Sequence, residues 1–114
     1  HNGVRFDRPF LNARAIKFGV KTLDCRGRII DPVLLARRHL KMGSNRLDNL
    51  SIYLNTRNRK TPLDGTLWLR AILDRDASAM DMIVEHCIND VLVLEEVMTA
   101  LQPFCGNINS WGSA

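Results

Sequence analysis

The feature that most constrains this chain is an apolar repeat near its C-terminal end, over about residues 78–101. Apolar side chains recur there at steps of three and four residues, which places them on one face of an α-helix. Pro103 follows and marks the end of the pattern. The repeat predicts a long amphipathic helix with one buried stripe, made of Met80, Val84, Cys87, Val91, Leu94, Met98 and Leu101.

Shorter helices are expected upstream of the long one. Asp7 is a suitable N-cap for the first of them and Gly19 a suitable stop, while Pro32 opens the second. Residues 55–64 are a loop by composition, and the segment 20–31, which ends Ile-Ile-Asp, is the best candidate for a strand. The four helices are predicted at about residues 8–19, 32–43, 47–54 and 65–73.

Length and composition indicate one globular domain or part of one. The chain has 114 residues, of which 46% are apolar and 25% charged, a balance that argues against disorder. No apolar run approaches the roughly 20 residues of a membrane span, and the polar, basic start lacks the pattern of a signal peptide. Three widely spaced cysteines argue against a disulfide framework and favour a cytoplasmic protein without membrane contact.

Charge is distributed unevenly along the chain. Residues 1–36 carry a net charge of +4 and residues 37–60 a net charge of +6, whereas residues 61–114 carry −6. A dense basic segment suits a polyanion, because each neutralised phosphate releases counterions, although a solvated surface that favours solubility is the simpler alternative. The candidates for nucleic-acid binding in this segment are Arg37, Arg38, Lys41, Arg46, Arg57, Arg59 and Lys60.

Two short constellations could carry chemistry. The first is the N-terminal run Asn-Gly-Val-Arg-Phe-Asp, which ends at Asp7, and the second contains His86 and Asp90. His86 and Asp90 are four residues apart on the long predicted helix, so they share a face, which borders the buried stripe. A half-buried carboxylate needs a partner, and a metal ion is one such partner. The simpler alternatives are an N-cap for Asp7 and a surface ion pair for His86 and Asp90.

Together the two constellations resemble a specific family. HNGVRFDRPFLNAR resembles the second motif of the DEDD-type 3′–5′ exonucleases, and EHCINDVLVLEEV resembles their third motif. The segments IIDPVLLARRHLK, SNRLDNLSIYL and DGTLWLRAI are similar to predicted exonucleases of phages and bacteria, above all to the phage-type stand-alone domain. The resemblance covers about residues 1–103. It implies an α/β fold of the RNase H-like class, present here mainly as its helical C-terminal part with one short strand.

The resemblance also implies a site and a reaction. The family holds two Mg²⁺ or Mn²⁺ ions with four carboxylates and hydrolyses phosphodiester bonds from the 3′ end of single-stranded DNA or RNA. Asp7 matches the second carboxylate and Asp90 the fourth, and His86 would orient or deprotonate the attacking water. Asn2 completes the second motif and is a candidate nucleic-acid contact, while Phe6 is expected to pack beneath the site.

The chain departs from the family pattern in two ways. The Asp-x-Glu motif that carries the first two carboxylates is absent, so residues 1–103 are expected to be a partial domain that lacks the first strands and a preceding segment of the parent chain, with 104–114 as a loose tail. In addition, three residues separate His86 from Asp90, which is the spacing at which one subfamily has Tyr, whereas the subfamily with His has four residues in between. His86 therefore either activates water or packs locally, and the fragment alone is expected to be inactive.

Two further residues and a rival function belong to the expectations. Asp31 either supports the site or caps the helix after Pro32, and capping is the simpler interpretation. Trp68 is expected in the core rather than as a platform for base stacking. The rival function is a helical module that binds nucleic acid without catalysis, for which Asp7 and Asp90 have no reason to converge.

Overall fold

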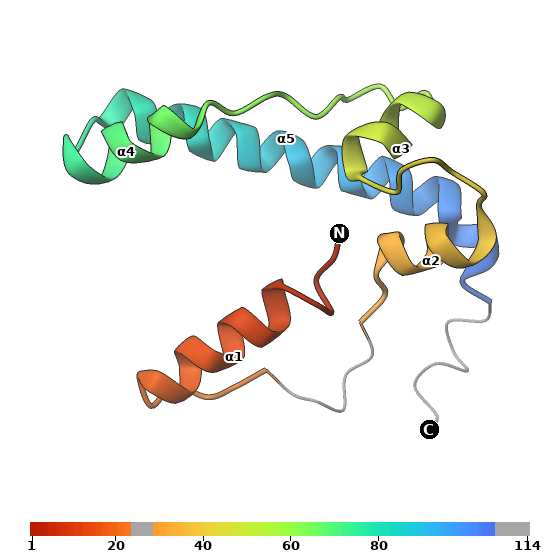
Figure 1. The fold of residues 1–114 in the computed structure, drawn as a ribbon, viewed down its shortest axis with the longest axis horizontal. Coiled ribbons are helices and arrows are strands. Elements are labelled where there is room, and N and C mark those ends of the chain that lie inside the picture. Colours follow the sequence, from red (N-terminus) through yellow and green to blue (C-terminus); the bar gives the residue numbers. More distant parts are fainter. Residues whose placement is uncertain (24–28, 107–114) are drawn as a thin grey trace. The chain divides into compact units, whose positions relative to one another are not determined.

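The computed structural model describes residues 1–23 and 29–106, and these residues form five α-helices and a short 3₁₀-helix (Figure 1). The chain divides into two compact units, one made of residues 1–45 and 101–114 and the other of residues 46–100. In chain order the elements are α1 (Asp7–Lys17), α2 (Pro32–His39), α3 (Leu47–Tyr53), α4 (Gly65–Leu73), α5 (Ala77–Leu101) and η1 (Gln102–Phe104).

Helix α1 begins one residue earlier than the sequence predicts. The N-cap residue is Phe6, which makes no side-chain cap, and Asp7 is the first helical residue. The N-cap expected at Asp7 is therefore wrong, although a carboxylate in the first turn still faces the positive end of the helix dipole. The predicted stop at Gly19 is confirmed: Gly19 has a φ of 65°, and the Val20 N–H donates to the Ala15 carbonyl at 2.9 Å, as in a Schellman motif.

The short strand expected within residues 20–31 is not formed at 20–23 or 29–31, and residues 24–28 lie outside the described part of the chain. Pairing needs a neighbouring strand, and the described residues contain none. The end of this segment instead starts a helix, because the Asp31 side chain accepts a hydrogen bond from the Val33 N–H and Pro32 occupies the first turn of α2. The structure thus supports the helical part of the expected RNase H-like fold, but not its short strand.

The predicted helices of residues 46–100 are confirmed with small shifts in their ends. Leu47 and Leu50 of α3 are buried, and the Asp64 side chain caps α4 by accepting from the Thr66 N–H. That backbone hydrogen bond lowers the pKa of Asp64. The core position expected for Trp68 is wrong, because its side chain is 47% exposed and Leu67 is the buried residue of α4.

Helix α5 begins after a strongly bonded aspartate. One carboxylate oxygen of Asp76 accepts from the backbone and hydroxyl of Ser78 and from the Ala79 N–H, and the other pairs with Arg70 at 2.6 Å. The Ser78 hydrogen bond, followed by that of Arg70, lowers the pKa of Asp76 to about 2. Asp76 therefore fixes both the start of α5 and its turn from α4.

The buried stripe of α5 is displaced by one residue from the predicted one over most of the helix, whereas the predicted burial of Leu101 is confirmed. Met80, Val84 and Val91 are exposed, whereas the buried residues along the helix are Ala79, Ile83, Val93, Val97 and Leu101. A shift of one residue rotates the buried face by about 100°. Both faces of α5 are apolar, so periodicity could not decide between them. His86 and Asp90 therefore lie in line with the observed stripe, because positions 86 and 90 continue it at steps of three and four residues.

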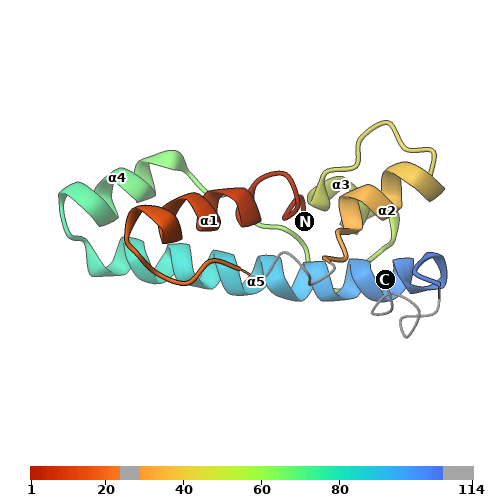
Figure 2. The same ribbon diagram turned by 90° about the horizontal axis from the view of Figure 1, so that it is seen from below.

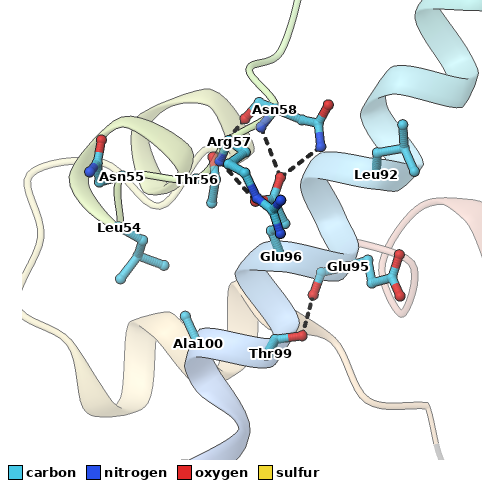
Figure 3. A pocket seen from close by; sticks show the side chains of 10 residues that line it. All are labelled: Leu54, Asn55, Thr56, Arg57, Asn58, Leu92, Glu95, Glu96, Thr99 and Ala100. Carbon is cyan, nitrogen blue, oxygen red and sulfur yellow. Dashed lines mark hydrogen bonds between the residues drawn. The ribbon is translucent and has the colours of Figure 1, made fainter.

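An extended segment connects α3 to α4 and runs along α5 (Figure 1). We refer to residues 57–63 as the strap. At its first end the Glu96 carboxylate accepts from the Arg57 N–H at 2.8 Å and from the Asn58 N–H at 2.9 Å (Figure 3). At its other end Leu63 packs on Leu67, Ala79 and Ile83. Helix α4 lies alongside the first half of α5 in both views (Figures 1 and 2). The strap is thus held against α5 over much of its length.

Packing continues beyond the end of α5. The Phe104 ring stacks on His39 with centroids 4.7 Å apart, and Cys105 is buried. The tail expected from residue 104 is therefore packed as far as Cys105, while residues 107–114 lie outside the described residues. Cys87 is exposed, and Cys25 also lies outside the described residues.

Candidate active site

The structure brings His86 and Asp90 together on α5. The His86 Nε2 atom lies 3.3 Å from the Asp90 Oδ2 atom, and the two side chains are 15% and 28% exposed. The sequence places this pair at the border of the buried stripe, whereas the structure places it within the stripe. Two polar groups occupy positions where an amphipathic helix would ordinarily have apolar side chains, which favours a role for them other than packing.

One oxygen of Asp90 has no hydrogen-bond partner. Its Oδ1 atom is buried, while Oδ2 faces His86. A buried carboxylate oxygen that lacks a donor costs free energy, which a bound cation would recover. Carboxylate oxygens are the ligands that Mg²⁺ and Mn²⁺ prefer. The Asp90 Oδ1 atom therefore has the chemistry of a ligand for a divalent cation.

The second nitrogen of His86 is engaged from the strap. The Thr61 Oγ1 atom lies 2.8 Å from His86 Nδ1, so both ring nitrogens have partners. Because a neutral imidazole carries one N–H and one lone pair, one nitrogen donates and the other accepts. Thr61, His86 and Asp90 thus form a continuous chain of a hydroxyl, an imidazole and a carboxylate. Thr61 could not be identified from the sequence, because nothing in the spacing of a loop threonine links it to a helical residue 25 positions later.

The second motif lies in the other compact unit. Asp7 is an exposed residue in the first turn of α1, preceded by a turn in which the Phe6 N–H donates to the Asn2 carbonyl at 3.1 Å. A Cβ atom at Gly3 would lie 3.8 Å from the Asp7 Oδ2 atom, in ordinary van der Waals contact. Phe6 does not pack beneath a site, because its ring is 62% exposed and stacks on Phe10.

The Asp31 side chain binds the backbone of this motif. Its carboxylate is buried and accepts from the Asn2 N–H at 2.8 Å and from the Val4 N–H at 3.2 Å, in addition to capping α2. Asn2 has a φ of 65°, a conformation that asparagine adopts more readily than most residues. The capping role of Asp31 is therefore confirmed, and the same carboxylate also binds the backbone of the turn that precedes Asp7.

Asp7 and Asp90 belong to different compact units, so their convergence remains a prediction. Within the described residues no group of three or more His, Cys, Asp or Glu side chains is arranged to hold a metal ion. The pair of Asp90 and His86 is thus the part of the expected site that the structure assembles.

The basic residues of segment 37–60 are exposed on both units, as their candidate role requires. Arg59 also has a structural task, because its guanidinium donates to the Ser51 carbonyl at 2.5 Å and to the Thr56 hydroxyl at 3.0 Å. It closes the C-terminal end of α3, where carbonyl groups lack helical partners. Arg57 and Lys60 are the better candidates in the strap for contacts with phosphate.

Two cavities meet at the His86 ring. One of about 410 Å³ is lined by Asp48, Lys60, Thr61, Pro62, Leu63 and His86. Another of about 320 Å³ shares Thr61 and His86 and extends to Glu85 and Asn89. A larger cavity of about 570 Å³ lies farther along α5, beside Glu96 and the start of the strap (Figure 3). The ring of His86 therefore borders open space on the strap side, where a ligand could approach it.

Comparison with known proteins places the chain in a family. Residues 1–102 match the family model of the RNase H superfamily. No curated protein and no solved structure matches the chain. None of the helices within residues 1–23 and 29–106 combines the length and the apolar character that crossing a lipid bilayer requires. The matched region contains both motifs and the whole strap. The chain belongs to the RNase H superfamily, and this membership indicates a nuclease-type hydrolase that acts on nucleic acid.

Proposed function

We propose that this protein contributes to a metal-dependent 3′–5′ exonuclease that hydrolyses phosphodiester bonds of single-stranded nucleic acid. The observation that carries the proposal is the buried, unpartnered Oδ1 atom of Asp90 beside His86, inside the region that matches the RNase H superfamily. Asp7 and Asp90 would hold Mg²⁺ or Mn²⁺, and the resemblance to DEDD-type exonucleases supports the direction of cleavage.

Each side chain has a distinct task in the proposed reaction. In the hydrolysis a water oxygen forms a bond to phosphorus, the bond between phosphorus and the 3′ oxygen breaks, and the departing oxygen takes a proton. Bound divalent ions supply Lewis-acid stabilisation of the phosphate and make the water more acidic. His86 can hold or accept the proton of that water at Nε2. Arg57 and Lys60 hold the phosphate backbone by charge, without reading sequence.

The first test is metal binding, because it needs no activity. We expect Mn²⁺ to broaden the NMR signals of Asp90 and its neighbours on α5, and those of the Asp7 turn, through paramagnetic relaxation. Asp90→Asn should remove the broadening on α5, whereas Asp81→Asn, an exposed carboxylate on the same helix, should leave it unchanged. Equal broadening in wild type and Asp90→Asn at millimolar Mn²⁺ would overturn the assignment of Asp90.

The second test is catalysis on a single strand labelled at its 5′ end. The 114 residues lack an Asp-x-Glu motif on an early strand, so we expect weak hydrolysis or none from this chain alone. Any EDTA-sensitive activity should shorten the strand from the 3′ end and disappear in Asp90→Asn. Efficient release of mononucleotides by the purified chain would show that two further carboxylates are not required.

A second candidate function is binding of nucleic acid without catalysis. The observation in its favour is that the seven basic residues of segment 37–60 are all exposed. Under this alternative, Asp7→Asn and Asp90→Asn would leave strand binding and its dependence on Mg²⁺ unchanged. Under the exonuclease proposal, Mg²⁺ should strengthen binding of the 3′ end in the wild type and lose that effect in the variants.

A further inference from the structure

The strap is fixed to α5 at three successive points. Glu96 binds the N–H groups of residues 57 and 58, the Asn89 amide donates to the Arg59 carbonyl at 2.5 Å, and His86 meets Thr61. The positions on the strap rise while those on α5 fall, so the two segments run antiparallel. Each attachment limits how far the strap can slide along the helix. The contact between Thr61 and His86 is therefore the last of an ordered series.

The residues after Thr61 restrict it further. Pro62 disfavours helical backbone angles at residue 61 and holds it in an extended conformation. Leu63 then packs on the buried cluster of Leu67, Ala79 and Ile83. With attachments on both sides, the Thr61 hydroxyl is held at a defined place beside the ring, 2.8 Å from Nδ1.

We propose that Thr61 is the positioning residue of His86, holding the imidazole through Nδ1 so that Nε2 is directed at Asp90. The inference rests on the proposed function for what Nε2 does there, but the positioning itself is a property of the chain. A hydroxyl can both donate and accept, so Thr61 keeps a hydrogen bond to Nδ1 in either neutral form of the ring.

The two forms correspond to two situations at Asp90. Beside a carboxylate without a cation, Nε2 carries the proton and donates to Oδ2, while the Thr61 hydroxyl donates to Nδ1. When the carboxylate oxygens of Asp90 bind another partner, the proton can move to Nδ1, which then donates to the Thr61 oxygen. In this form Nε2 presents its lone pair. A general base needs this second form, since its lone pair must face the proton that it accepts. Thr61 permits the exchange without a change in ring orientation.

The surroundings of the ring agree with this role. Thr61 and His86 line both cavities that meet at the ring, and Lys60 adds a positive charge to the larger of them. Because the ring borders open space on the strap side, close packing alone does not fix its orientation there. Thr61 provides a hydrogen bond on that side, opposite the contact of Nε2 with Asp90.

The test uses NMR of the imidazole nitrogens in the 114-residue chain, without metal or nucleic acid, at about pH 8, where an ordinary imidazole is neutral. In the wild type we expect the Nδ1 signal of a hydrogen-bonded acceptor and a single set of nuclear Overhauser contacts from the ring to Thr61 and Asp90. Thr61→Val, which keeps the shape and removes the hydroxyl, should shift Nδ1 to the value of a free acceptor and average the contacts. Thr61→Ser should restore the wild-type pattern.

A second readout is acylation of His86 by diethyl pyrocarbonate, followed by mass spectrometry with His1 and His39 as internal references. The reagent attacks the ring lone pair, which Thr61 covers, so Thr61→Val should raise the rate at His86 several-fold and Thr61→Ser should not. Thr99→Val is the matched control, because the Thr99 hydroxyl bonds only the Glu95 carbonyl of its own helix in the described structure.

The outcomes separate this inference from the proposed function. Unchanged Nδ1 signals and contacts in Thr61→Val would overturn the positioning role, even if Mn²⁺ binds at Asp90. Equal effects of Thr61→Val and Thr61→Ser would also overturn it, since the hydroxyl would then be irrelevant. If the wild type does not bind Mn²⁺, the proposed function is overturned, but the positioning role of Thr61 is unaffected.

Discussion

The buried carboxylate of Asp31 accepts hydrogen bonds from the backbone of Asn2 at 2.8 Å and of Val4 at 3.2 Å. Through these bonds it attaches the turn that precedes Asp7 to the start of α2, 27 to 29 residues later in the chain. The position of the second motif thus depends on a residue outside it.

Replacing Asp31 should destabilise the unit that contains it. Asp31→Ala leaves the N–H groups of Asn2, Val4 and Val33 without their acceptor, and we expect a loss of about 2–4 kcal/mol in the free energy of unfolding. Urea denaturation measures this loss. Asp48→Ala is the control, because Asp48 is exposed and its carboxylate accepts from the N–H of the adjacent Asn49, so its effect should stay below about 1 kcal/mol. Equal effects would mean that Asp31 does not hold the turn.

The Glu96 attachment should make the strap sensitive to acid. Hydrogen bonds from the Asn58 and Arg57 N–H groups lower the pKa of Glu96 in the folded state. A lowered folded-state pKa gives stabilisation that is present above the unfolded-state pKa and lost as pH falls through the folded-state value. The protection of the Arg57 and Asn58 amides against hydrogen exchange, relative to the intrinsic exchange rate at each pH, should therefore fall below about pH 4.

The matched pair for this prediction is Glu96→Gln and Glu95→Gln, two neighbouring positions on α5. Glu96→Gln should leave the two strap amides weakly protected at all pH values and remove the acid-dependent loss. Glu95→Gln should preserve the wild-type profile, since Glu95 supplies neither bond to the strap in the described structure. A wild-type profile in Glu96→Gln would refute the attachment.

The basic residues of the strap should contribute to strand binding through charge. Arg57→Ala combined with Lys60→Ala should weaken binding of single-stranded DNA and reduce the slope of log K against log salt by about 1.4, or about 0.7 per phosphate contact. Fluorescence anisotropy at several salt concentrations gives the slope. Lys21→Ala with Arg75→Ala removes equal charge outside segment 37–60 and should change the slope less. Arg59→Ala is unsuitable here, because it also opens the end of α3.

The position of the buried stripe on α5 can be tested with three valines. Val93 and Val97 are fully buried, whereas Val91 is 58% exposed. Val93→Ala or Val97→Ala should each cost about 1–2.5 kcal/mol of unfolding free energy, and Val91→Ala less than about 0.5 kcal/mol. The predicted stripe of the sequence would reverse this order, so thermal or chemical denaturation decides between the two faces.

The helices of this protein could be placed from the sequence because their signals are local. Pro32, Gly19 and the cap residue Asp31 act within one turn, and the loop before α4 follows from its composition. The pair of His86 and Asp90 could likewise be found, because four residues on a helix fix a shared face. These features needed no knowledge of what packs against them.

Other features were decided by tertiary contacts. Helix α5 is apolar on two faces, and the packing of Leu63 and Leu67 determines that Ala79 and Ile83 are buried rather than Met80. Farther along the same face Val93 and Val97 are buried as well. The role of Thr61 depends on a strap that returns along α5, and that of Asp31 on a turn nearly 30 residues away. Hydrogen bonds between distant segments leave no periodic trace in a sequence, because each needs only one polar residue at each end. The sequence by itself therefore determined the helices and the paired His86 and Asp90, while the tertiary structure decided which helix face is buried and which residues hold the candidate site in place.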